Sequence, residues 1–292
     1  FMSTLENKTT PQNKMLFLKI ILACLISFIA LVLPNFIFLK IGILNSDPVY
    51  RHIVKSFFVA TIAVLGVWLL RSKLDKGVPV SIGLTKPSIA IPHALLGFGL
   101  VLAPLVLTLI IGRVFGWGEF SFNSGGVLRV IILGTISTLF TDALTEEIIF
   151  RGYIYSNLKE RFNVWISSLI SLILFVTIAV TIMAFQSHFG IPGAGRLLTG
   201  NFVVTLIFFG AFMQYLRVAY KSIWVGVGFH LFFVHMNKLM GATDDRLIQF
   251  SETSYQEQPM QITLIILILL AFAALILFPI IKKKRKGAIE KV

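Results

Sequence analysis

The sequence predicts an all-α, polytopic membrane protein with about eight transmembrane helices and both termini in the cytoplasm. Three observations predict this fold class. Hydrophobic residues make up 57% of the chain, charged residues only 13%, and the mean hydropathy is +0.89, whereas a soluble domain averages about 25% charged residues. Apolar runs of about 20 residues, the length that crosses a bilayer, recur along the chain. Basic residues gather in alternate loops, as cytoplasmic loops do.

Each predicted span is an apolar run bounded by charged or turn-forming residues. No internal repeat, Gly/Ser-rich linker or soluble domain separates these runs, so residues 1–292 are expected to form a single membrane domain. The sixth run is the shortest and gives the weakest signal. In order, the expected spans are Met15–Phe38 (which contains Pro34), Val54–Leu70, Ile91–Ile111, Val127–Tyr155, Val164–Phe185, Phe202–Leu216, Ile223–Leu239 and Met260–Ile281.

The distribution of basic residues favours an even number of spans. The tail Lys282–Lys286 is basic throughout and indicates a cytoplasmic end. With eight spans, the same side receives most of the remaining basic residues, and the opposite side receives fewer. The residues expected on the cytoplasmic side include Arg71, Lys73, Lys76, Lys86, Lys159, Arg161, Arg217 and Lys221.

The net charge of +13 is interpreted as a topology signal rather than a nucleic-acid footprint. The basic residues sit in short loops and the tail, where they face anionic lipid headgroups, and no basic surface interleaved with stacking aromatic residues is present. Cys24 is the single cysteine, which excludes an intramolecular disulfide and a cysteine-based metal site. The expected location is a cell membrane, and the small, basic, polytopic character of the chain favours a bacterial plasma membrane.

Two carboxylates and an arginine lie inside the fourth predicted span. Charges at membrane depth cost about 2.5–3.5 kcal/mol each and usually have a function. Glu147 and Arg151 are four residues apart, so they can pair on one helix face. Glu146 is rotated by about 100° and remains free to act on water as a general base. A structural ion-pair network and the proton site of a transporter are the alternatives.

Two histidines add to this pattern. His188 ends the fifth span, where a lone histidine is usually an ordinary interfacial residue. His230 lies within the seventh span, where an imidazole at membrane depth needs a polar partner. His235 and Asn237 follow near the end of the same helix. His230 is therefore the stronger candidate for a functional role.

Two segments resemble a known family. They are Glu146-Glu147-Ile148-Ile149-Phe150-Arg151-Gly152-Tyr153 and Ser222-Ile223-Trp224-Val225-Gly226-Val227-Gly228-Phe229-His230. Together with a histidine after an aromatic residue, this pattern resembles the CAAX protease and bacteriocin-processing (Abi) family of intramembrane endopeptidases, which are related to type II CAAX prenyl endopeptidases. The resemblance covers about residues 125–237, so residues 125–240 are expected to form the catalytic core.

The resemblance implies a glutamate-activated water that attacks a peptide carbonyl. Glu146 would be the general base, and His188 would hold and polarise the water. Glu147 and Arg151 would support the site and contact substrate, and His230 would donate to the oxyanion, a contribution of about 10²–10³ in rate. The implied substrate is a peptide or membrane protein. No cofactor is favoured, and zinc bound by Glu146, His188 and His230 is the alternative.

The second family motif, Phe-x-x-x-His, is not intact. Phe185 precedes His188 by three residues instead of four, and the better match, beginning at Phe175, ends on Ala179. At about 1.5 Å of rise per residue, His188 would lie near the outer end of its helix. His188 reaches Glu146 only if that helix breaks near its end or begins later than the predicted start at Val164.

The third family motif, His-x-x-x-Asn or His-x-x-x-Asp, is not intact either. Val234 stands four residues after His230, and Asn237 is about 10 Å along the helix. A non-catalytic scaffold or immunity protein is therefore the second hypothesis. A proton-coupled transporter is the third, although the chain lacks the inverted repeat and paired broken helices typical of transporters.

Overall fold

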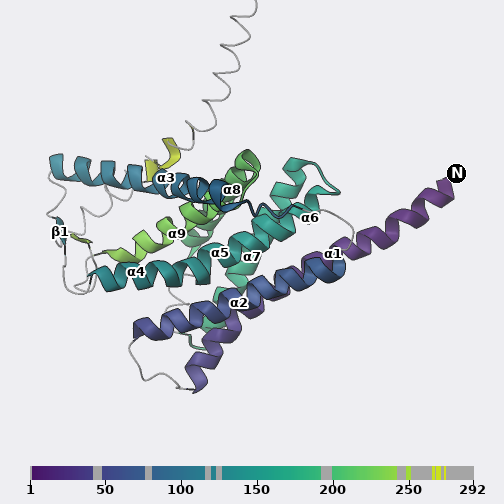
Figure 1. The fold of residues 1–292 in the computed structure, drawn as a ribbon, viewed down its shortest axis with the longest axis horizontal. Helices are drawn as coiled ribbons and strands as arrows, with labels where there is room; N and C mark the ends of the chain where they lie inside the picture. The colour runs from purple at the N-terminus through teal and green to yellow at the C-terminus, as the bar shows by residue number, and fades with distance from the viewer. Residues whose placement is uncertain are drawn as a thin grey trace, which may run out of the picture.

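The chain folds into a bundle of long helices (Figure 1). The computed structural model describes residues 2–41, 48–75, 81–115, 120–122, 127–191, 199–241, 248–250, 265–266, 268–270 and 273. The predicted all-α class is confirmed, with one small addition. Within the described residues, three very short strands form a sheet in the order β1-β3-β2, with β1 antiparallel and β2 parallel to β3.

The helices follow the predicted spans closely. Between α3 and α7, a helical segment changes from α to π geometry twice, through η1 and η2. The elements are α1 (Met2–Ile41), α2 (Pro48–Leu74), α3 (Pro87–Val114), β1 (Phe120–Phe122), α4 (Val127–Thr138), η1 (Leu139–Ala143), α5 (Leu144–Glu146), η2 (Glu147–Ile154), α6 (Tyr155–Lys159), α7 (Val164–His188), α8 (Gly200–Tyr220), α9 (Trp224–Leu239), β2 (Met240–Gly241) and β3 (Ile248–Phe250).

In the part of the chain that the structure describes, five helices are long and apolar enough to cross a membrane: α1, α2, α3, α7 and α8. Helix α8 is longer than the sixth predicted span, because it starts at Gly200 and ends at Tyr220. Helix α9 contains a shorter apolar segment, Trp224–His235. Most of the eighth predicted span, Met260–Ile281, lies outside the described residues, as does the basic tail. The count of eight spans and the cytoplasmic position of both termini therefore stay predictions.

The helices that surround the fourth span pack in a regular succession. Helix α3 packs on α9, α9 on the α4–η2 helix, and that helix on α2, which pairs with α1 (Figure 1). Helices α7 and α8 pack against each other and flank η2. The α3–α9 contact is very close, because a Cβ atom on Gly97 would lie 2.0 Å from the Val225 carbonyl oxygen. Small residues permit such close packing where lipid gives no hydrophobic drive.

Candidate functional site

The charged residues of the fourth span lie where the helix leaves α geometry. Glu146 is the last residue of α5, and Glu147 begins the π-helical segment η2, which contains Arg151. The Thr145 hydroxyl donates a hydrogen bond to the Phe140 carbonyl oxygen, five residues earlier, at 2.7 Å. Such π segments inside α-helices are frequent at functional sites. Sequence spacing alone did not predict this change of geometry.

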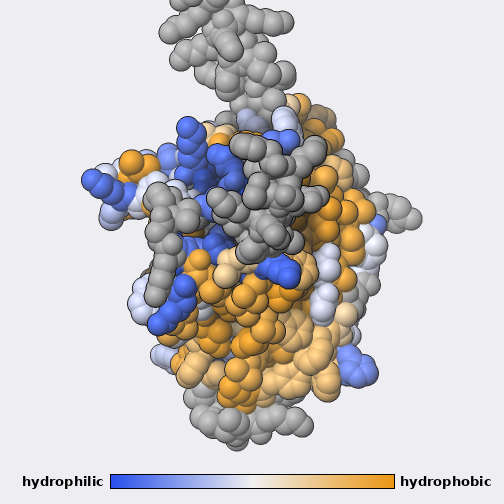
Figure 2. Space-filling model, turned by 90° about the vertical axis from the view of Figure 1, so that its right-hand side faces the viewer, coloured by the Kyte–Doolittle hydropathy of each residue, from blue (hydrophilic) through white to orange (hydrophobic). Residues whose placement is uncertain are grey.

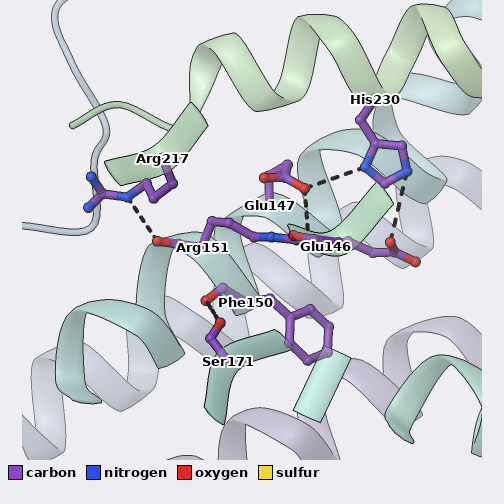
Figure 3. A network of polar contacts seen from close by, with 8 residues as sticks. Glu146, Glu147, Phe150, Arg151, Ser171, Arg217 and His230 are labelled. Atoms are coloured by element: carbon purple, nitrogen blue, oxygen red, sulfur yellow. Dashed lines mark hydrogen bonds and ion pairs between the residues drawn. The ribbon is translucent and has the colours of Figure 1, made fainter. Parts of the chain in front are cut away.

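Glu146, Glu147, Arg151 and His230 meet in one cluster (Figure 3). Arg151 Nη1 donates a hydrogen bond to Glu147 Oε1 at 3.1 Å, so the structure contains the pair that the spacing predicted. His230 lies between the two glutamates: its Nδ1 is 3.5 Å from Glu147 Oε1, and its Nε2 is 3.9 Å from Glu146 Oε2. The two glutamates, on α5 and η2, therefore supply the polar neighbours that an imidazole at this depth requires.

The four side chains differ in their exposure. The side chains of Glu147 and Arg151 are each 1% exposed, and that of His230 is 4% exposed. Glu146 is 18% exposed and is the most open member of the cluster. Gly226 of α9 covers Glu147, since a Cβ atom at position 226 would lie 2.7 Å from Glu147 Oε2. A ligand therefore meets Glu146 before any other charged group of the cluster.

Several further residues hold Arg151 in place. Its Nη2 donates to the Gly210 carbonyl oxygen at 3.2 Å, and its guanidinium carbon lies 4.2 Å from the centroid of the Phe175 ring. The backbone carbonyl oxygen of Arg151 accepts a hydrogen bond from Arg217 Nε at 2.9 Å (Figure 3). The Ser171 hydroxyl donates to the Phe150 carbonyl oxygen at 3.2 Å. Helices α7 and α8 thus both hold the helix that carries the glutamates, which runs from α4 to α6 and is called the glutamate helix below.

Sequence reasoning missed Arg217, which it treated only as a topology signal. The structure buries this side chain and bonds it to the backbone of the glutamate helix. The signal that could have found it is the one that identified Arg151. Both are arginines in or at the edge of a long apolar run, where an unpaired charge is costly.

The structure does not bring His188 into the cluster. Helix α7 runs without a break from Val164 to His188, and Phe175 on it contacts Arg151. His188 comes 13 residues after Phe175, which is about 20 Å farther along the helix axis. It is exposed, and its ring packs on Phe189 at 5.0 Å between centroids. The break that would have carried His188 toward Glu146 is absent from this described helix.

The contacts of Phe175 show which turn of α7 packs against the charged cluster. Phe175 is buried and packs against both Phe150 and Arg151 of η2. Ala179 lies one turn farther on, in the place that the resemblance reserves for a histidine. An alanine side chain can neither hold water nor donate a hydrogen bond.

The polar group expected after His230 is also missing from its place. Val234 stands one turn after His230 and offers no side-chain donor. His235 is buried on another face of α9, where it packs against Gly134 of α4. The side chain of Asn237 lies outside the described residues. His230 is therefore the donor that α9 contributes to this cluster.

The zinc alternative would need Glu146, His188 and His230 together. Among the residues that the structure describes, no three His, Cys, Asp or Glu side chains are arranged to hold a metal ion. His188, at the far end of α7, does not complete the ligand set in this arrangement. The expectation of a metal-free site stays a prediction.

Comparison with known proteins identifies the central part of the chain. Residues 128–236 match the family model described as "Type II CAAX prenyl endopeptidase Rce1-like". The match runs from α4 to α9 and includes all four members of the cluster. No curated protein and no solved structure matches the chain. The family match and the long apolar helices together indicate a multi-pass membrane protein with a peptidase-family domain.

Proposed function

We propose that this chain, which carries an Rce1-like type II CAAX prenyl endopeptidase domain at residues 128–236, binds a polypeptide segment of a membrane protein at Glu146 without hydrolysing it. The family relationship supports a site for a polypeptide. The side chains in that site support binding better than they support bond cleavage.

The exposure of Glu146 carries the proposal. Glu147 and Arg151 are closed off and paired with each other, whereas Glu146 is 18% exposed and its Oε2 is 3.9 Å from His230, beyond hydrogen-bond distance. A carboxylate in this position accepts hydrogen bonds from the backbone N–H groups of an extended segment. Such charge-assisted bonds are about twice as strong as neutral ones, and more so where water is excluded.

Hydrolysis would require more groups than the cluster provides. The resemblance implies four of them: a base, a second histidine that holds the water, and two oxyanion donors. Ala179 and Val234 occupy two of those places, and His188 lies elsewhere. Loss of one oxyanion donor typically lowers the rate by about 10²–10³. Loss of a positioned water partner adds to that deficit.

A reduced endopeptidase mechanism is the second candidate, and the Glu146–His230 contact favours it. In that mechanism Glu146 takes a proton from a water molecule, and the hydroxide attacks the scissile carbonyl. His230 donates to the oxyanion, and Glu146 returns the proton to the departing amine. This mechanism needs one base and one donor, and both are present within 3.9 Å.

The test separates binding from cleavage in one experiment. The full chain is reconstituted in liposomes with a panel of tagged single-span peptides, and co-purification measures binding while mass spectrometry detects products. We expect bound peptide, no product, and weaker binding by Glu146→Gln. Product that disappears in Glu146→Gln would establish the endopeptidase instead. If the experiment detects neither bound peptide nor product, both candidate functions are overturned.

A gain-of-function variant sharpens the test. Ala179→His with Val234→Asn restores the two family groups, and His188→Ala serves as the matched control outside the cluster. Under the proposal, the double variant binds the same peptides and forms product, whereas the wild type forms none. The control leaves both binding and product unchanged.

A further inference from the structure

A separate cavity opens at the end of the glutamate helix. It has a volume of about 520 Å³ and lies where α6 ends, between the start of α7 and the end of α8. Small-molecule sites commonly have volumes of 300–1,000 Å³. Its lining is Ser81, Tyr155, Ser156, Lys159, Glu160, Val164, Arg217, Val218 and Lys221. None of these residues belongs to the Glu146–His230 cluster.

The lining is basic. Lys159, Arg217 and Lys221 face a single carboxylate, Glu160, so the formal charge of the lining is +2. No ion pair between Glu160 and either lysine is present among the described residues. The two ammonium groups are thus available to an anion.

Arg217 forms a fixed floor for the cavity. Its Nε donates to the Arg151 carbonyl oxygen, and its Nη2 donates to the Ser81 carbonyl oxygen at 3.1 Å and to Ser156 Oγ at 3.3 Å. Gly83 presses on the guanidinium, since a Cβ atom at position 83 would lie 2.8 Å from its Cζ. Within the described structure, Nη1 has no acceptor, so an oriented donor remains for a ligand.

Lys221 is held in an unusual backbone conformation beside this floor. It follows α8 directly and has φ 54°, in the left-handed region. Glycine and asparagine usually occupy such positions at helix ends, because a longer side chain is strained there. The chain instead places a lysine at this turn, where its side chain lines the cavity.

Exposed aromatic residues lie close to the cavity in the sequence of α7 and of the turn before it. Trp165, in the first turn of α7 next to Val164, is 84% exposed, and Phe162 in the preceding turn is also exposed. Exposed aromatic rings of this kind mark the boundary between headgroups and acyl chains. Leu169 and Ile173 continue as exposed apolar residues farther along α7. Figure 2 views the molecule from the side on which α6 lies in Figure 1, and it shows hydrophilic side chains gathered beside a broad hydrophobic area.

We propose that this cavity binds a phosphate group, presented by the headgroup of an anionic phospholipid. Lys159 and Lys221 supply the charge, and Arg217 supplies the oriented donor. Basic pockets between transmembrane helices on the positively charged side of a membrane protein are suited to such headgroups. The exposed aromatic and apolar residues of α7 and the turn before it would then contact the acyl chains of the bound lipid.

The test measures lipid binding by the detergent-solubilised full chain. Phosphatidylglycerol with brominated acyl chains quenches tryptophan fluorescence on binding, and brominated phosphatidylcholine is the neutral comparison. We expect the wild type to bind phosphatidylglycerol more tightly. Lys159→Gln with Lys221→Asn should weaken that binding about 25-fold, at about fivefold per lysine. Asparagine is chosen because it tolerates the left-handed conformation.

The controls distinguish the site and the source of the phosphate. Lys73→Gln removes an exposed lysine outside the cavity lining and should leave binding unchanged. Circular dichroism of the double variant should match that of the wild type. Equal binding of both lipids, or an unchanged affinity in the double variant, overturns the proposal. Displacement of phosphatidylglycerol by millimolar inorganic phosphate would assign the cavity to a soluble anion and overturn the lipid source.

Discussion

The two halves of α7 contact different partners. In the N-terminal half, Ser171 and Phe175 pack on η2 and help to hold Arg151. In the C-terminal half, Phe185 packs on Phe28 of α1, at 5.2 Å between ring centroids, and on Phe189. One half supports the charged cluster, and the other half attaches the helix to its neighbour.

This difference shows why a histidine near a recognised motif need not belong to it. A continuous helix fixes the axial position of every residue once one residue is placed. Phe175 is placed by its contact with Arg151, so Ala179 occupies the next turn and His188 lies far beyond it. The contacts of a motif residue therefore decide its role better than its residue type.

Arg151→Met should give the largest loss of stability, because Arg151 is the residue that the N-terminal half of α7 helps to hold. It leaves Glu147 buried without its partner, and breaking a buried pair in this way costs about 3–5 kcal/mol in the free energy of unfolding. Denaturation of the purified chain in detergent measures the change. The double variant Glu147→Gln with Arg151→Met should lose less, and an equal or larger loss would show that the pair is not the source of the effect.

Gly97→Ala tests the packing that presents His230 to the cluster. The added methyl group would overlap the Val225 carbonyl oxygen of α9, and such overpacking costs about 1–3 kcal/mol. Gly99→Ala is the matched control on the same helix, because nothing lies within 4 Å of its Cβ position. Thermal unfolding should separate the two variants clearly. Equal stability would mean that α3 and α9 are less closely packed than the Gly97–Val225 contact indicates.

Glu146→Gln should separate function from stability. The most exposed member of the cluster has its nearest cluster partner at 3.9 Å, so its loss should change the free energy of unfolding by less than about 1 kcal/mol. Peptide binding should fall at the same time, because the amide is neutral. A large loss of stability with unchanged peptide binding would make Glu146 a structural residue.

His188→Ala gives the smallest expected effect. The exposed side chain at the end of α7 should contribute no more than about 0.5 kcal/mol to the free energy of unfolding. Peptide binding and any product formation should equal those of the wild type. A loss of either function would contradict the comparison between the two halves of α7 and would require His188 to reach Glu146 in another conformation.

The sequence predicted features that depend on neighbouring residues in the chain. Composition predicts the five long apolar helices and the helical segment of the fourth span. A spacing of four residues predicts the pairing of Glu147 with Arg151. Position 230 was also identified, because a histidine inside an apolar helix needs a polar partner. The identity of that partner could not be predicted, since it lies on another helix.

Tertiary structure decided which distant residues share the cluster. The sequence alone determined a helical membrane protein with a buried charge pair, because local hydrophobicity and helical periodicity act over a few residues. Packing of α9 placed His230 between two glutamates, packing of α8 turned Arg217 onto the Arg151 carbonyl, and an unbroken α7 kept His188 away. These outcomes depend on the register between helices, which is set by close contacts such as that of Gly97 with Val225.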